Sequence, residues 1–189
     1  MNISFTGKFG GWMSIVSGVS LAAAHTTDLV AGGEGTVEGK TLVFLAHLLL
    51  VFAFVGIHER LGASNGWLGS LGMPLGIAGT IVVDAIVFAE TAAVQGIDVS
   101  EVLRSGPNAA ISGVGPLLFV LGLVFVGIAI ARSRSLPRWA GWSLVVGTVV
   151  FALATTAGPA EALVTAIGSA LTGLGFVGAG LPMTRGNRK

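Results

Sequence analysis

Apolar residues run along this chain in six long stretches, separated by short segments rich in Gly, Pro, Ser or charged residues. The stretches cover residues 10–31, 41–61, 67–95, 109–131, 139–157 and 161–182. A bilayer core of about 30 Å is crossed by about 20 helical residues, so each stretch is long enough for one membrane-spanning helix. The pattern predicts an all-α integral membrane protein, a six-transmembrane-helix bundle that forms a single membrane domain over residues 1–189.

Composition supports this class of protein. The chain is 53% apolar and only 10% charged, with a mean hydropathy of +0.89, whereas a soluble domain has about 25% charged residues. There are no cysteines, which excludes disulfides, thiolate metal sites and iron–sulfur clusters. The basic residues lie in short loops beside the apolar stretches, so we expect the lipid bilayer as a partner and no nucleic acid.

The distribution of positive charge predicts the orientation of the bundle. With the N-terminus inside, the inner side carries Lys8, Arg60, Arg132, Arg134, Arg138, Arg185, Arg188 and Lys189, and the outer side carries only Lys40 and Arg104. The outer loops instead hold Glu34, Glu38, Asp98, Glu101 and Glu161. Because cytoplasmic loops collect Lys and Arg, we expect a multi-pass protein of the cell membrane with both termini in the cytoplasm.

A short motif recurs in every second stretch. It reads Phe54-Val55-Gly56, Phe125-Val126-Gly127 and Phe176-Val177-Gly178, and an arginine follows shortly each time. The recurrence predicts three repeated helix pairs in parallel orientation; the alternative is chance, since Phe, Val and Gly are abundant here. The chain has 30 glycines, and small residues let helices approach closely in lipid.

Ionisable residues within the first three stretches mark a candidate site. An ionisable side chain inside a membrane costs about 2.5–3.5 kcal/mol, so it indicates function by default. His25, His47 and Glu90 each fall five or six residues from an outer helix end, which places them at one depth at about 1.5 Å per residue. Asp84 lies deeper on the third stretch, and His58 lies three turns below His47, too far to join the same site.

This constellation suggests two kinds of cofactor. His25, His47 and Glu90 are a candidate ligand set for a transition metal, and His25 and His47 alone are candidate axial ligands of haem b. Asp84 and Asp28 would assist the ligands or relay protons. The alternative is that each histidine is a buried residue hydrogen-bonded to a neighbouring helix, that Glu90 lies among the headgroups, and that Asp28 is interfacial.

The layout resembles a broad group of six-span membrane proteins found in actinobacteria and some archaea. The resemblance rests on His25 closing the first stretch, on Ala46-His47-Leu48 and Ala89-Glu90-Thr91, and on the turn Leu136-Pro137-Arg138-Trp139-Ala140-Gly141. In that group the first histidine is usually followed by proline, whereas Thr26 follows here. The group has no established activity, so the resemblance implies a fold and no chemistry.

Three functions follow as alternatives. The first is a haem or transition-metal protein that serves in electron transfer or as a redox-complex subunit. The second is a proton-coupled transporter or channel for a small solute. The third is a structural or accessory subunit without chemistry, within a homo-oligomer or beside partner membrane subunits. No Walker loop or His-Glu-x-x-His motif is present, so neither of these enzyme classes is indicated.

Overall fold

The computed structural model describes residues 4–33 and 35–185, and these residues form helices joined by short turns. The long helices are α1 (Phe5–Val30), α2 (Val37–Leu61), α3 (Gly66–Ala93), α5 (Gly106–Arg132), α6 (Arg138–Leu153) and α7 (Glu161–Thr184). The short elements are α4 (Ser100–Arg104) and the 3-10 turns η1 (Gly62–Asn65), η2 (Ala154–Thr156) and η3 (Gly158–Ala160). The all-α fold class is confirmed. Glu34, Arg188 and Lys189, used above for orientation, lie outside the described residues.

Two elements differ from the sequence prediction. The apolar pattern extended the fifth stretch to residue 157, but α6 ends at Leu153 and the 3-10 turn η2 follows. The chain turns here because Gly158 adopts a φ of +54° and Pro159 follows it, and apolarity alone does not reveal where a helix stops. The short helix α4 was not predicted; its five residues are too few to give a periodic pattern.

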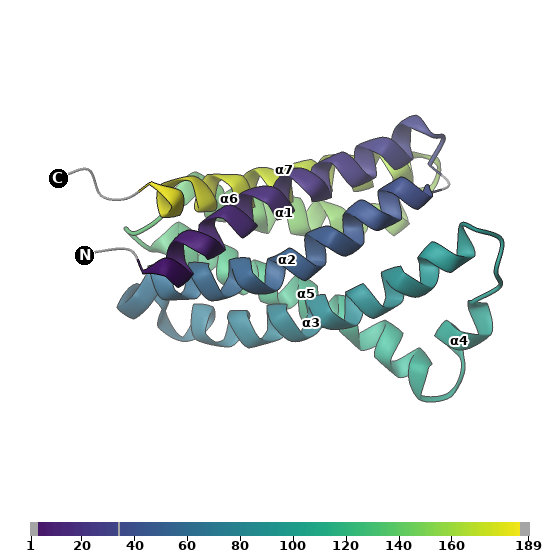
Figure 1. The fold of residues 1–189 in the computed structure, drawn as a ribbon, viewed down its shortest axis with the longest axis horizontal. Coiled ribbons are helices and arrows are strands. Elements are labelled where there is room, and N and C mark those ends of the chain that lie inside the picture. The colour runs from purple at the N-terminus through teal and green to yellow at the C-terminus, as the bar shows by residue number, and fades with distance from the viewer. Residues whose placement is uncertain (1–3, 34, 186–189) are drawn as a thin grey trace.

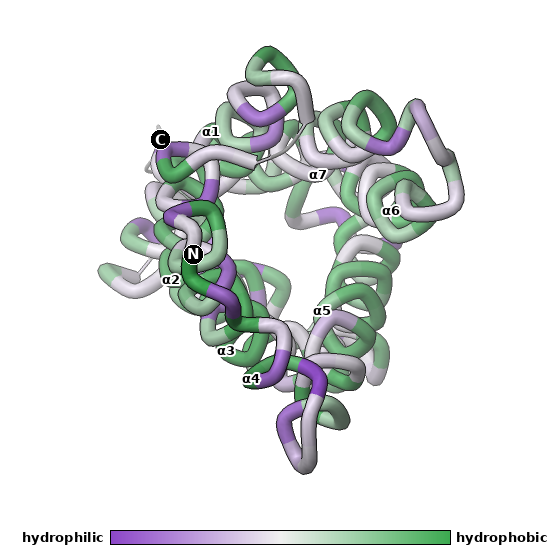
Figure 2. Tube along the Cα trace, turned by 90° about the vertical axis from the view of Figure 1, so that its right-hand side faces the viewer, coloured by the Kyte–Doolittle hydropathy of each residue, from purple (hydrophilic) through white to green (hydrophobic). Residues whose placement is uncertain are grey.

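The long helices form a closed ring in sequence order (Figures 1 and 2). Each packs against its neighbours along the chain, and α1 closes the ring by packing against α7. Packing is most extensive within the hairpins α1–α2, α3–α5 and α6–α7 and across the α1–α7 seam. The three helix pairs suggested by the repeat are therefore three packed hairpins, although their common origin stays a prediction.

The α1–α7 seam combines hydrogen bonds with glycine contacts. Ser14 donates to the carbonyl oxygen of Phe176 at 2.7 Å, and Ser169 donates to that of Leu21 at 2.7 Å. Between them, Gly18 and Gly173 are so close that a Cβ on either would collide with the other's backbone. Hydroxyls and small residues are the usual means of joining helices in lipid, so the first and last helices are directly linked.

Side chains fill the ring in the half nearest the two termini. Phe54 of α2 and Phe176 of α7 meet edge to face there, with ring centroids 6.1 Å apart, and both are buried. Leu123, Ile130 and Leu144 belong to the same cluster. This half of the ring is a packed apolar core.

The outer surface of the ring is apolar as well. Every long helix exposes large hydrophobic side chains, for example Val19, Leu48, Phe88, Leu117, Val149 and Leu174. Four helical stretches of the described residues are long and apolar enough to cross a membrane: Val37–Ala93, Gly106–Arg132, Arg138–Thr156 and Gly158–Thr184. The first contains both α2 and α3, whereas α1 does not qualify. These surfaces are typical of an integral membrane protein.

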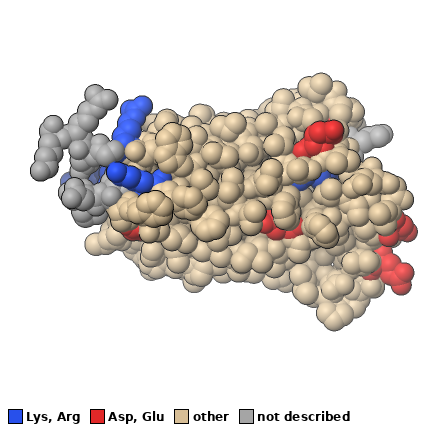
Figure 3. All heavy atoms as spheres, viewed as in Figure 1, with Lys and Arg blue, Asp and Glu red and all other residues tan. Residues whose placement is uncertain are grey.

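Charged side chains gather at the two ends of the bundle (Figure 3). Lys and Arg lie mostly at the end that carries both termini, and the carboxylates lie mostly at the opposite end, which carries α4. We refer to these as the terminal end and the α4 end. The long sides between them are almost free of charge in this view, as expected for a surface that faces lipid.

Candidate functional site

A cavity of about 240 Å³ lies inside the ring on the α4 side of the packed core. All six long helices contribute to its wall, so the cavity is formed by the whole bundle rather than by one pair of helices. The lining residues are Leu21, His25, Lys40, Val43, His47, Val83, Ile86, Val87, Glu90, Pro116, Phe119, Val120, Leu123, Thr148, Phe151, Ser169 and Thr172. Most of these side chains are apolar.

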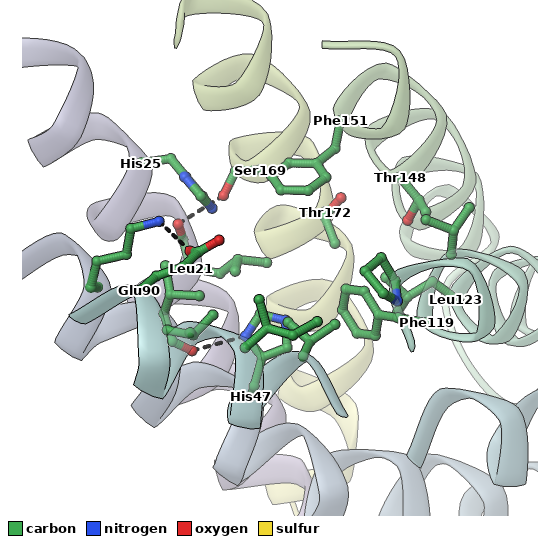
Figure 4. A pocket seen from close by; sticks show the side chains of 17 residues that line it. Leu21, His25, His47, Glu90, Phe119, Leu123, Thr148, Phe151, Ser169 and Thr172 are labelled. Atoms are coloured by element: carbon green, nitrogen blue, oxygen red, sulfur yellow. Dashed lines mark hydrogen bonds and ion pairs between the residues drawn. The ribbon is translucent and has the colours of Figure 1, made fainter. Parts of the chain in front are cut away.

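His47 is the most enclosed ionisable group of the cavity wall (Figure 4). Its side chain is only 4% exposed, and its Nδ1 lies 2.9 Å from the carbonyl oxygen of Val43, one turn earlier in α2. The ring of Phe119 lies against the imidazole, with centroids 4.9 Å apart. Nε2 is buried and has no hydrogen-bond partner among the described residues. A buried polar atom without a partner is uncommon and calls for an explanation.

His25 lies on a different part of the wall. It is half-buried on α1, and its ring meets that of Phe151 edge to face, with centroids 5.2 Å apart. In Figure 4 the ring of His25 lies beside Ser169 and Phe151, whereas that of His47 lies beside Phe119. The two histidines therefore share one cavity, as their common depth suggested, but neither ring stacks on or faces the other in this view.

Glu90 is paired with a cation that the sequence analysis assigned only to the outer loops. Its Oε2 lies 2.5 Å from Nζ of Lys40, which joins the last turn of α3 to the first turn of α2 at the α4 end of the cavity. The sequence spacing could have placed Lys40 at the cavity, since Lys40, Val43 and His47 share one face of α2. The carboxylate is thus already engaged, and it is not free to act as a metal ligand unless the pair opens.

Asp28 and Asp84 do not line the cavity. Asp28 accepts hydrogen bonds from the backbone nitrogen and the hydroxyl of Thr36, both at 2.8 Å, and so holds the turn between α1 and α2. Asp84 lies on α3 between the cavity-lining residues Val83 and Ile86, with a buried Oδ1 that has no partner within the described chain. Neither carboxylate is part of the cavity wall, and the expected role of both in assisting the histidines or relaying protons stays a prediction.

The arrangement bears on the predicted cofactors. Within residues 4–33 and 35–185, no three side chains of His, Cys, Asp or Glu are grouped closely enough to hold a metal ion. A cavity of about 240 Å³ is also smaller than the roughly 300–1,000 Å³ of sites for drug-sized ligands, and haem is a ligand of at least that size. The chemistry that the wall offers directly is hydrogen bonding and proton exchange at His47.

The polar groups contributed by α6 and α7 were not singled out in the sequence. Thr148 lines the cavity with a buried hydroxyl that lacks a partner among the described residues, whereas the hydroxyls of Ser169 and Thr172 are bonded to backbone carbonyls. A lone Thr in an apolar stretch has no distinguishing pattern, because its hydroxyl usually bonds to its own helix. Only the tertiary structure identifies Thr148.

Comparison with protein-family models, with curated proteins and with solved structures gave no match to this chain. The resemblance to six-span actinobacterial and archaeal proteins therefore stays a prediction. The function has to be argued from the geometry of the cavity itself.

Proposed function

We propose that this protein is a membrane transport protein that binds a small, mostly apolar solute in the cavity and couples its movement to protons through His47. The observation that carries the proposal is a buried Nε2 of a histidine that has no partner within the described part of the chain, in the wall of a cavity surrounded by all six long helices. Ionisable groups at such positions in membrane proteins typically mark substrate and proton pathways. The protein would reside in the cell membrane, on its own or with further copies or partner subunits.

The ionisable groups around the cavity favour His47 as the coupling group. They come from three helices: His25 from α1, Lys40 and His47 from α2, and Glu90 from α3. The lining residues of α5, α6 and α7 carry no ionisable group. Lys40 and Glu90 neutralise each other, and His25 is less completely buried than His47. His47 is thus the deepest and most enclosed ionisable group of the cavity wall.

Transport requires that the cavity open toward the other side. The terminal half of the ring is closed by buried side chains, including Phe54 and Phe176, so a solute would cross only if helices moved against one another. Such rocking between two halves of a bundle is how many transporters expose one site alternately to each side. In the proposed topology, with six spans and both termini cytoplasmic, the cavity belongs to the outer half of the membrane.

The coupling can be tested in proteoliposomes that contain a pH-sensitive dye and hold a proton gradient. Neutral alcohols, phenols, amides and ketones are added one at a time, and solute-dependent loss of the gradient is recorded against empty liposomes. We expect at least one class to move protons with the wild-type protein and not with His47→Ala. Leu48→Ala, an exposed neighbour on the same helix, is the matched control and should behave like the wild type. A wild-type protein that moves no protons with any solute would refute the proposal.

The topology can be tested independently because the chain lacks cysteine. Ala63→Cys lies in η1 at the terminal end, and Ser100→Cys lies at the start of α4; both positions are exposed. In intact cells, a membrane-impermeant maleimide should label Ser100→Cys and leave Ala63→Cys unlabelled until the membrane is permeabilised. The reverse pattern would place the cavity in the inner half of the membrane.

A transition-metal site is the second candidate, and one observation favours it. With Nδ1–H bonded to a backbone carbonyl, His47 has the orientation that metal-binding histidines usually adopt, with Nε2 free for the ligand bond. His25 would be the second ligand, and Glu90 a third once released from Lys40. The test is the metal content and absorption spectrum of protein purified from cells supplied with transition metals; a colourless, metal-free sample would reject it.

A further inference from the structure

The backbone of α2 holds His47 in one tautomer. Nδ1 lies 2.9 Å from the carbonyl oxygen of Val43, and a carbonyl oxygen only accepts hydrogen bonds. In the neutral imidazole, Nδ1 therefore carries the hydrogen and Nε2 carries the lone pair. It follows that neutral His47 can present only a hydrogen-bond acceptor to a ligand in the cavity.

That acceptor is unsatisfied in the structure. Nε2 is buried, and no described side chain or backbone group donates to it. Leaving a buried polar atom without a hydrogen bond costs free energy in an apolar environment. A ligand that donates a hydrogen bond to Nε2 would therefore gain binding free energy. A ligand with acceptors only, such as a ketone, a quinone or an ether, would leave Nε2 of His47 unsatisfied.

The rest of the wall restricts the body of the ligand. Around His47 the cavity is lined by aliphatic and aromatic side chains, among them Val43, Val83, Val87, Phe119 and Leu123. The two charged residues of the wall, Lys40 and Glu90, bind each other, which leaves no free charge to attract an ionic ligand. The wall thus suits an uncharged and largely apolar molecule.

The volume of the cavity limits the size of the ligand. An apolar protein cavity of about 150 Å³ holds benzene, so this cavity of about 240 Å³ has room for a ring with one or two small substituents. A molecule of that size also spans from the imidazole into the apolar part of the wall.

We infer that the ligand of this cavity is a small neutral hydroxyl compound, a phenol or an alcohol with an apolar body, that donates its O–H to Nε2 of His47. The inference rests on one part of the proposed function, namely that the cavity binds a solute. It adds the chemical class of that solute. It also explains why a buried imidazole in this wall is left without a partner within the described chain.

The test compares p-cresol with p-xylene. The two compounds have the same shape, but p-cresol carries a hydroxyl where p-xylene carries a second methyl group. Binding is measured to the full-length protein in nanodiscs, and uptake by empty nanodiscs is subtracted. We expect p-cresol to bind about tenfold more tightly than p-xylene, the usual effect of one buried hydrogen bond. Protein labelled with ¹⁵N-histidine provides the second readout: p-cresol should shift the Nε2 resonance of His47, whereas p-xylene should not.

Two controls are built into the chain. His58, at the far end of α2, does not line the cavity, so its ring resonances should not move with either compound. His47→Leu, which also assigns the resonance, removes the acceptor and keeps the bulk. It should lose the preference for p-cresol while still binding p-xylene.

The outcomes separate this inference from the proposed function. Equal binding of both compounds by the wild type, with an unmoved His47 resonance, would overturn the hydroxyl class but leave the cavity as a binding site. Binding of neither compound would overturn the hydroxyl class together with the solute site. Both results come from the wild-type protein, so they stand even if His47→Leu fails to fold.

Discussion

Nζ of Lys40 lies 2.5 Å from Oε2 of Glu90, and this ion pair joins the start of α2 to the end of α3 beside the cavity. The two side chains are 24% and 37% exposed, so the pair is partly screened by solvent. Among the described residues, no other Lys, Arg, Asp or Glu lines the cavity. The pair is well placed to hold these helix ends together.

The first prediction concerns the opposite charges of Lys40 and Glu90. Lys40→Glu and Glu90→Lys each place two like charges together and should lower thermal stability, whereas the double exchange should restore most of the loss. Each neutral variant, Lys40→Met or Glu90→Gln, should cost less than about 1 kcal/mol because the pair is half-exposed. Melting temperatures in detergent at low and high salt check this, since screening should reduce the differences. A double exchange no better than the single ones would argue against a direct pair.

The second prediction concerns the turn between α1 and α2. Asp28→Ala removes an acceptor that serves both the backbone nitrogen and the hydroxyl of Thr36, while Thr36 in turn caps α2 through Gly39. We expect a loss of about 1–2 kcal/mol, measured by reversible unfolding in mixed micelles. Asp28→Asn keeps one acceptor oxygen and should lose less. If Asp28→Ala left stability unchanged but abolished transport, a proton-relay role would replace this structural one.

The third prediction compares two glycines. A Cβ at Gly56 of α2 would lie 2.6 Å from the Cα of Gly10 on α1, so Gly56→Ala must force the two backbones apart. We expect a loss of about 1–3 kcal/mol, the usual cost of overpacking. Gly113→Ala in α5 is the matched control: nothing lies within 4 Å of its Cβ position, and the better helix former should be neutral or stabilising by up to about 1 kcal/mol. Equal effects at both sites would mean that α1 and α2 do not approach as described.

The fourth prediction concerns Asp98, in the exposed loop before α4. A side-chain hydrogen bond from Ser100, aided by its backbone N–H at 2.9 Å, lowers the pKa of Asp98 below its ordinary value of 3.8. The hydrogen bonds therefore favour the folded loop above the ordinary pKa, and this contribution is lost as the pH falls through the lowered pKa. Ser100→Ala should raise the pKa of Asp98 toward 3.8, as followed by carboxyl ¹³C NMR, whereas Ser105→Ala should leave it unchanged.

Much of the helical layout could be predicted from local features. The helix-forming stretches, their approximate ends and the common depth of His25, His47 and Glu90 all follow from apolar length and from counting residues along a helix. These quantities depend on one segment at a time, so a single sequence is enough. The end of α6 was misjudged because the residues after Leu153 stay apolar while the backbone already turns.

The partners of the polar residues could not be predicted in the same way. Lys40 was counted as a loop charge although α2 already begins at Val37 and Lys40 shares a helical face with His47. Depth alone also did not show that Asp84 lies outside the cavity wall. The ion-pair partner of Lys40 and the surroundings of Asp84 depend on direction around a helix rather than on depth along it. That direction depends on how neighbouring helices cross.

The sequence by itself determined that this protein is helical and apolar, and at which height along the helices its ionisable side chains stand, because rise per residue is a property of a single helix. Only the tertiary structure decided that α1 closes the ring against α7, that the terminal half is packed while the other half encloses a cavity, and that Glu90 binds Lys40 while Nε2 of His47 is left without a partner among the described residues. These features depend on which faces of the six helices meet. Side-chain volumes and the positions of the glycines determine which faces meet, and they do so only when all six helices are packed together.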